Sequence, residues 1–151
     1  MIRRWTLSDN PTVAKIEQNS FSDPWTEEML EQSLSSPAFH GFVLEADGRV
    51  CGYVGLLCAF DAEIALIAVD GALRRRGYGK QLLDYGVEFA RQMGCENVFL
   101  EVRQSNVSAK ALYQKAGFKS IAVRPRYDAD GEDAIVMVLP TDYTIVTEEK
   151  K

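Results

Sequence analysis

Residues 74–80 hold four of the chain's 17 lysines and arginines, in the sequence Arg-Arg-Arg-Gly-Tyr-Gly-Lys. The segment follows a predicted strand and opens a predicted helix, and its two glycines let the backbone turn tightly near a ligand. In the first turn of a helix the backbone N–H groups have no helical partner, and the helix dipole adds positive charge there. The segment therefore favours an anion site, and a pyrophosphate would suit it.

The same segment also has a simpler explanation. Its spacing matches neither the phosphate-binding pattern G-x-x-x-x-G-K-S/T nor the dinucleotide-binding pattern G-x-G-x-x-G. Arginine clusters are common on protein surfaces, so a solvated turn that only caps a helix also accounts for the composition. The loop by itself leaves both interpretations open, and the second half of the chain favours the anion site.

Two residues in that second half could supply a base and an acid. Glu101 lies near the carboxyl end of the strand predicted over residues 97–102, where open α/β sheets bind their ligands. Tyr113 falls in the helix predicted over residues 106–116. Taken singly, Glu101 would more often be a surface partner of Arg103, and Tyr113 would more often be a core residue.

The elements that must position these residues alternate along the chain. Asp47-Gly48 between two apolar runs predicts a β-hairpin, and Gly94 and Gly117 stand where glycine commonly ends a helix. The predicted helices cover residues 8–19, 26–34, 80–93 and 106–116, and the predicted strands cover residues 42–44, 50–60, 64–69, 97–102, 118–124 and 134–139. This order indicates an α+β, or α/β-like three-layer, fold in which helices cover both faces of a single sheet.

Length and composition indicate one domain. The chain has 151 residues, of which 46% are hydrophobic and 26% are charged, as is typical of a globular protein. We expect a domain over residues 1–140 and a C-terminal tail over residues 141–151 that has little to pack against. The net charge of −5 argues against direct binding of nucleic acid.

The chain also lacks signals for export or membrane insertion. No apolar run approaches the roughly 20 residues of a membrane span, and the N-terminus lacks the apolar core of a secretory signal. Cys51, Cys58 and Cys95 are odd in number and have no metal-ligand spacing. We therefore expect reduced thiols, no metal, no membrane partner and a cytoplasmic location. The sequence gives no indication of the oligomeric state.

Taken in order, these motifs resemble the GNAT family of N-acetyltransferases. Residues 67–69 with the later Arg74-x-x-Gly77-x-Gly79 resemble the family's acetyl-CoA-binding signature. Residues 100–106 and the helix after them are similar to its RimI-type branch, which acetylates the N-terminal alanine of a small-subunit ribosomal protein. Other matching residues are Phe21, Pro24, Trp25, Ala109, Leu112, Tyr113, Gly117, Phe118, Glu132, Asp133, Ala134 and Met137. The resemblance covers about residues 5–139 and implies a single GNAT-type mixed, largely antiparallel sheet.

The resemblance implies that acetyl-CoA is the cosubstrate. The matching coenzyme-binding positions are Ile67, Ala68, Val69, Arg75, Arg76, Gly77, Tyr78, Gly79, Lys80 and Asn106. The first three belong to the strand whose backbone pairs with the pantetheine arm, and the loop residues form a pyrophosphate cradle, largely through main-chain N–H groups. Glu101 matches the general base of the branch, and Tyr113 matches its general acid.

These implied roles agree with the chemistry of acetylating an N-terminal amine. An α-amine has a pKa near 8, so at neutral pH it is mostly protonated and needs a base. A carboxylate such as Glu101 can take that proton, directly or through a water. The free amine then attacks the thioester carbonyl, whose oxyanion needs an N–H donor near Val69, and Tyr113 protonates the departing thiolate. Such a transfer is direct and forms no covalent enzyme intermediate.

Other residues are alternatives for parts of this chemistry. Glu63, at the start of the strand that leads to the coenzyme positions, is a second candidate base, because some relatives use a carboxylate there. Cys51 or Cys95 could carry the acetyl group as a thioester, although neither has a histidine close in sequence. His40, the single histidine, is interpreted as a strand-edge residue. Residues 124–128 depart from the adjacent tyrosines of the branch, which leaves the acceptor open.

The main hypothesis is therefore an enzyme that acetylates the N-terminal peptide of a ribosomal or other protein. Internal lysines or small-molecule amines are alternative acceptors. A non-catalytic acetyl-CoA sensor is the alternative from a different class. Loss of the base and the acid would favour the sensor, but Glu101 and Tyr113 fill both positions.

Overall fold

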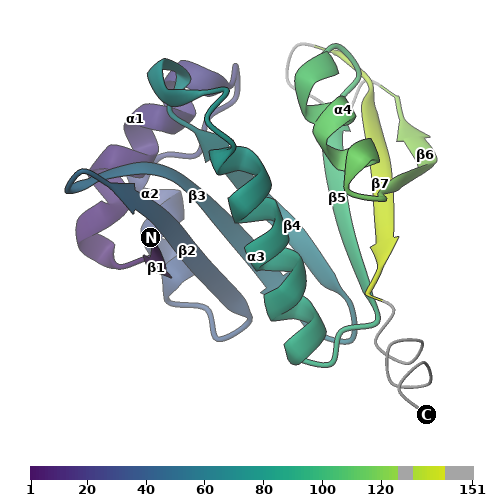
Figure 1. Ribbon diagram of the computed structural model, residues 1–151, viewed down its shortest axis with the longest axis horizontal. Coiled ribbons are helices and arrows are strands. Elements are labelled where there is room, and N and C mark those ends of the chain that lie inside the picture. Colours follow the sequence, from purple (N-terminus) through teal and green to yellow (C-terminus); the bar gives the residue numbers. More distant parts are fainter. Residues whose placement is uncertain (126–130, 142–151) are drawn as a thin grey trace. The chain divides into compact units, whose positions relative to one another are not determined.

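The computed structural model describes residues 1–125 and 131–141 of the chain (Figure 1). Its strands are β1 (Ile2–Arg4), β2 (Phe39–Ala46), β3 (Arg49–Cys58), β4 (Ala62–Val69), β5 (Asn97–Arg103), β6 (Lys119–Arg124) and β7 (Ala134–Pro140). Its α-helices are α1 (Asn10–Ser20), α2 (Glu27–Leu34), α3 (Tyr78–Gln92) and α4 (Val107–Lys115), and two 3-10 turns are η1 (Leu7–Asp9) and η2 (Gly71–Leu73).

The strands form one mixed sheet in the order β1-β2-β3-β4-β5-β7-β6. β4 and β5 run parallel, whereas the pairs β1–β2, β2–β3, β5–β7 and β6–β7 are antiparallel. Parallel neighbours need a crossover connection, and α3 supplies it. The predicted α+β, largely antiparallel sheet is therefore confirmed.

The chain divides into two compact units, and each is described by itself. The first unit comprises Met1–Leu57 and Ala65–Gly86, and the second begins with Cys58–Ile64 and resumes at Val87. Strand β4 and helix α3 each contribute to both units. The domain boundary expected at residue 140 stays a prediction, since residues 142–151 of the expected tail lie outside the described residues.

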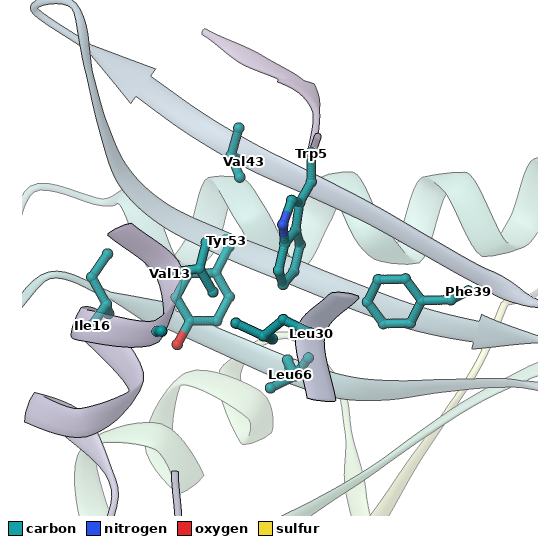
Figure 2. Packing of buried hydrophobic residues seen from close by; sticks show 9 residues of the cluster. Trp5, Val13, Ile16, Leu30, Phe39, Val43, Tyr53 and Leu66 are labelled. Carbon is teal, nitrogen blue, oxygen red and sulfur yellow. The ribbon is translucent and has the colours of Figure 1, made fainter. Parts of the chain in front are cut away.

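Helices α1 and α2 cover one face of the sheet in the first unit. Their apolar residues meet inward-facing strand residues in a cluster shown in Figure 2. The cluster consists of Trp5, Val13, Ala14, Ile16, Leu30, Phe39, Val43, Tyr53 and Leu66. Trp5 makes edge-to-face contacts with Phe39 and Tyr53 at ring-centroid distances of 5.7 and 5.6 Å. Such aromatic pairs add to the stabilisation that burial of their surface gives.

Helix α3 covers the opposite face of the same strands. Phe42 and Val54 are register partners next to the inward-facing pair of Val43 and Tyr53, so their side chains point the other way. The ring of Phe42 packs against that of Tyr85 in α3, with 4.9 Å between centroids. The predicted arrangement of helices on both faces of the sheet is therefore confirmed in this unit.

In the second unit, the two faces of the sheet differ in polarity. Val98, Leu100 and Val102 of β5 are buried, and they share their face with Leu139, their neighbour in β7. The turn after α4 packs on this face, because a Cβ at Gly117 would lie 3.2 Å from Leu139 Cδ1. The alternate residues of β5, which include Glu101, therefore occupy the other face.

The N-terminal segment differs from the sequence-based prediction. Strand β1 was not expected, because three residues that include two arginines carry no alternation signal. The helix predicted from residue 8 begins as the 3-10 turn η1, and α1 starts at Asn10. Asp9 accepts the N–H of Thr6 at 2.8 Å and the guanidinium of Arg3 at 2.9 Å instead of capping α1 through its side chain. Its contact with Arg3 lowers the pKa of Asp9.

A buried carboxylate lies next to the core of the first unit. Glu17 of α1 is 2% exposed, and it accepts the hydroxyl of Tyr53 at 2.6 Å and the backbone N–H of Trp25 at 2.9 Å. Burial, with a smaller contribution from the charge of Asp23, raises the pKa of Glu17 above its ordinary value of 4.5. Both donors are neutral, so the charge is only partly compensated.

This burial predicts a pH-dependent cost to stability. A carboxyl group whose pKa is raised by folding lowers the stability of the folded state only where it is ionised. This loss of stability is absent at a pH below the pKa of the group in the unfolded chain. It grows as the pH rises above that value and is complete above the pKa of the group in the folded protein. Glu17→Gln keeps the shape without the charge: its single oxygen can accept the Trp25 N–H, and its NH₂ group can donate to the Tyr53 hydroxyl oxygen. We expect it to unfold at the same or a higher denaturant concentration than the parent at pH 7, with the difference vanishing near pH 4.

The matched variant Glu17→Ala should behave differently. It leaves the Tyr53 hydroxyl and the Trp25 N–H without their acceptor, which costs about 1–3 kcal/mol for each buried group. Urea unfolding followed by far-UV circular dichroism measures both variants. A glutamine variant that is clearly less stable than the parent at pH 7 would show that the charge itself stabilises the fold.

Candidate active site

The expected coenzyme strand is the last part of β4. Ile67, Ala68 and Val69 are all half-buried there. The register between β4 and β5 covers Ala62–Ile64 and does not extend to residues 65–69. Unused N–H and C=O groups on a strand edge can pair with an extended amide ligand. The pantetheine arm of a coenzyme has two such amides.

Gly52 of β3 sets how closely β3 approaches this part of β4. A Cβ at position 52 would lie 2.8 Å from the carbonyl oxygen of Ala68 and 3.3 Å from Val69 Cα. Contacts this short are not tolerated between a side chain and a backbone. The glycine therefore fixes the position of the strand that carries the predicted coenzyme-binding residues.

This close approach predicts the effect of Gly52→Ala. The added methyl group must displace the backbone at Ala68, so we expect the KM for acetyl-CoA to rise about threefold to tenfold and the protein to lose about 1–3 kcal/mol of stability. Gly71→Ala is the matched control, because its Cβ would meet nothing nearer than Arg74 Cζ at 4.0 Å. Steady-state kinetics and urea unfolding measure both variants. Equal KM values and equal stabilities for the two variants would show that Gly52 does not position β4.

The predicted anion loop links η2 to α3, as expected. Two of its residues have a left-handed backbone, Arg75 with φ 69° and Gly77 with φ 81°. The first α-helical hydrogen bond of α3 runs from Gln81 N–H to the Gly77 carbonyl at 3.1 Å. The N–H groups of residues 78–80 precede it, so they are the donors that an anion would meet. Arg75 and Arg76 are exposed beside them.

The loop is tied to its own unit by Arg74. Its guanidinium donates to the carbonyl of Val69 and to the hydroxyl of Ser20, each at 3.4 Å. Lys80 forms an ion pair with Asp84 at 2.6 Å. The structure therefore places the predicted strand and the predicted cradle together in the first unit.

Glu101 lies on the polar face of β5 in the second unit. Its side chain is 24% exposed, and it accepts a hydrogen bond from Arg124 Nη1 at 2.5 Å. Glu63 is close enough to interact with both residues. Partial burial raises the pKa of Glu63, the charge of Glu101 raises it further, and Arg124 lowers it. The structure thus brings the two candidate bases together, and the charge of Arg124 acts on both.

Tyr113 lies in α4, and its ring is 7% exposed. It packs against Phe118 with 6.0 Å between ring centroids, and burial raises the pKa of Tyr113 to about 12. Because α4 is followed by the turn on the buried face of the sheet, Tyr113 and Glu101 belong to opposite faces of the second unit. Asn106 is the N-cap of α4, and its side chain accepts the N–H of Ala109 at 3.2 Å.

The comparisons with known proteins agree with this arrangement. A family model described as the acetyltransferase (GNAT) family matches residues 10–118. The chain belongs to the GNAT acetyltransferase family. It is therefore an N-acetyltransferase, as the resemblance implied.

Relatives of this GNAT enzyme match it over most of their length. The ribosomal protein bS18-alanine N-acetyltransferase of Escherichia coli K12 is 34% identical over 137 residues, which are 88% of this chain and 92% of that protein. The N-alpha-acetyltransferase RimI of Mycobacterium tuberculosis is 35% identical over 140 residues, or 87% of each chain. The E. coli ribosomal-protein-S18-alanine N-acetyltransferase crystal structure superposes with a TM-score of 0.86 at 32% identity and 93% coverage of both chains.

The thiols of this GNAT enzyme are placed as structural groups. Cys51 and Cys95 are buried, and their sulfurs lie 3.5 Å from the carbonyl oxygens of Arg49 and Ala59. Burial, and then the neighbouring Cys95, raise the pKa of Cys58 to about 11. A thiol with so high a pKa is almost fully protonated at neutral pH and is a poor nucleophile.

The single histidine lies away from the candidate bases in the sequence order of the strands. His40 lies in β2, and burial, with the charge of Arg4, lowers its pKa. Across residues 1–125 and 131–141, no three His, Cys, Asp or Glu side chains are grouped to hold a metal ion. No helix in those residues is long and apolar enough to cross a membrane.

The pairing of Arg124 with Glu101 was not predicted from the sequence. The sequence instead suggested Arg103, on the same strand, as the partner of Glu101, but Arg103 forms an ion pair with Glu132 at 3.3 Å. Arg124 stands at the end of β6, and only the strand order β5-β7-β6 brings it near β5. Of the segment 124–128 that departs from the RimI-type pattern, residues 126–128 lie outside the described residues.

Proposed function

We propose that this enzyme transfers the acetyl group of acetyl-CoA to the α-amine of a protein N-terminus, most specifically to the N-terminal alanine of ribosomal protein bS18. The observation that carries the proposal is the match to the E. coli and M. tuberculosis enzymes over nearly nine-tenths of this chain. By name, one is a ribosomal protein bS18-alanine N-acetyltransferase and the other is an N-alpha-acetyltransferase.

The first unit supports acetyl-CoA as the donor. The part of β4 beyond its ladder with β5, at Ile67, Ala68 and Val69, would pair with the pantetheine amides. The N–H groups of Tyr78, Gly79 and Lys80, with the nearby arginines, would hold the pyrophosphate. Asn106 of the second unit is assigned a further coenzyme contact.

The polar face of the second unit supports Glu101 as the general base. At neutral pH an α-amine with a pKa near 8 is mostly protonated and cannot attack a thioester. A half-exposed carboxylate can meet that ammonium group, take its proton and release it to solvent. The free amine then adds to the thioester carbon, and a backbone N–H of β4 near Val69 stabilises the oxyanion.

Tyr113 is proposed as the general acid. Collapse of the tetrahedral intermediate breaks the C–S bond and leaves a thiolate, which takes the phenolic proton of Tyr113, while the second proton lost by the acceptor nitrogen restores the phenol through solvent. Since burial raises the pKa of Tyr113 to about 12, its proton is present throughout the neutral range. Glu63 is the second candidate base, and its raised pKa makes it a stronger base but leaves it less ionised.

A peptide panel tests the acceptor. Purified enzyme and acetyl-CoA are offered peptides that differ in the first residue, with alanine, serine, methionine or proline at that position. We expect the alanine peptides, and above all one with the bS18 N-terminal sequence, to be acetylated fastest. Turnover of polyamines or free amino acids in preference to every peptide would support the small-molecule alternative. Tight acetyl-CoA binding without turnover of any amine would support the sensor.

A further inference from the structure

The carboxylate proposed as the base is already occupied by a cation of the protein itself. Arg124 Nη1 lies 2.5 Å from Glu101 Oε1. The side chain of Arg124 is 52% exposed, whereas that of Glu101 is 24% exposed. The guanidinium is therefore the more exposed partner of the pair, and a cationic acceptor that binds Glu101 must compete with it.

The sheet register explains how Arg124 reaches Glu101 across an intervening strand. In β7, Ala134 pairs with Arg124 on one side and with Arg103 on the other, and Val136 pairs with Glu101. Neighbouring strands are about 4.8 Å apart, so β5 and β6 are separated by about 10 Å, a distance that an arginine side chain can span. Alanine at position 134 leaves room on the sheet face for the arginine to pass.

A second carboxylate shares this cation. Glu63 is the register partner of Phe99 in β5, and so lies on the same face as Glu101. The charges of both Glu101 and Arg124 act on Glu63. Glu101 and Glu63 therefore both interact with the guanidinium of Arg124, whereas Arg103, on the same face of β5, pairs with Glu132.

We infer that Arg124 is an exchangeable counter-ion of Glu101: its guanidinium holds the carboxylate in the free enzyme and gives way to the α-ammonium group of the acceptor. The inference rests on the proposed function, since it takes the acceptor to be an α-amine. An ion pair exposed to this degree stabilises a protein little, so the exchange costs little. Arg124 acts through Glu101, and it is a positioning residue rather than a catalytic one.

The exchange predicts a split between KM and kcat. In the parent, the acceptor competes with Arg124 for one carboxylate, so Arg124→Gln should lower the KM for an alanine peptide about twofold to fivefold. Because the bound complex already has Arg124 displaced, kcat should stay within twofold of the parent. Arg124→Lys restores a competing cation and should return the KM to within twofold of the parent value.

Arg103→Gln is the matched control. It removes one positive charge from the same face of β5, but Arg103 forms an ion pair with Glu132. We expect its KM to stay within twofold of the parent. If Arg103→Gln lowered the KM as much as Arg124→Gln, the loss of positive charge from this face would explain the result, and the exchange at Glu101 would be contradicted. A rise in KM, or a tenfold loss of kcat, for Arg124→Gln would also overturn the inference.

A binding measurement separates this inference from the proposed function. The ¹⁵Nε resonance of Arg124 is assigned by its absence in Arg124→Gln and followed while the alanine peptide is added without acetyl-CoA. The free peptide should shift the resonance, and the same peptide with an acetylated N-terminus should not. An enzyme that acetylates no peptide would contradict the proposed function alone. No shift with the free peptide, or an equal shift with the blocked one, would contradict the exchange.

Discussion

Glu101→Gln is expected to lower kcat with an alanine peptide about 100- to 1,000-fold at pH 7, within the range that a general base contributes. Glutamine keeps the size and a hydrogen-bond acceptor for Arg124, but it cannot take the proton of the α-ammonium group. The residue lies on the polar face of β5, so the fold should be unaffected, and the KM for acetyl-CoA should stay within twofold. Steady-state kinetics with varied peptide and varied acetyl-CoA measure these values.

The pH dependence of this variant identifies the missing step. Above pH 8 a growing share of the acceptor is already the free amine and needs no base. The ratio of parent to variant rate should therefore fall between pH 7 and pH 9.5. Glu63→Gln is the matched control on the same face, and we expect it to lose less than tenfold in kcat. A Glu63 variant that loses as much as the Glu101 variant would assign the base role to the pair.

Tyr113→Phe is expected to lower kcat about 10- to 100-fold with little change in either KM. Phenylalanine keeps the ring that packs against Phe118, so the core around α4 stays filled. The loss arises because the thiolate must leave without a proton donor. Since burial raises the pKa of Tyr113 to about 12, the parent should not lose activity through ionisation of this group below about pH 10.

Tyr85→Phe provides the control for the loss of one phenolic hydroxyl. Tyr85 is 40% exposed in α3 and packs against Phe42. Its variant should keep the parent kcat, and thermal unfolding should show that both phenylalanine variants are folded at the assay temperature. If the Tyr113 variant kept the parent kcat, Tyr113 would not be the general acid, and water would protonate the thiolate.

Local chemistry was sufficient to predict many element boundaries. Asp47-Gly48 adopts φ of 53° and 76° at the predicted hairpin, and Gly94 ends α3 with φ 86°. These positions require left-handed backbone, and the residue types reveal that requirement directly. Asn106 was likewise identified as an N-cap, because its side-chain oxygen serves a backbone N–H within three residues.

Features that depend on distant residues were not predicted from the sequence. Strand β1 is held by its register with β2, about 40 residues away, and its three residues carry no pattern of their own. The pairing of Glu101 with Arg124 depends on β7 lying between β5 and β6, although β7 follows both in the chain. That Tyr113 and Glu101 occupy opposite faces also requires knowing which face α4 covers. Strand order and helix placement are set by packing, which local patterns do not encode.

The central claim is that the acceptor is an α-amine, and one measurement tests it most directly. A peptide that begins with alanine and contains one internal lysine is incubated with enzyme and acetyl-CoA. Tandem mass spectrometry then locates the added acetyl group, which raises the peptide mass by about 42 Da. We expect a single acetyl group on the α-nitrogen of alanine, with the lysine side chain unmodified. Acetylation of the lysine Nζ while the N-terminal amine stays free would contradict it.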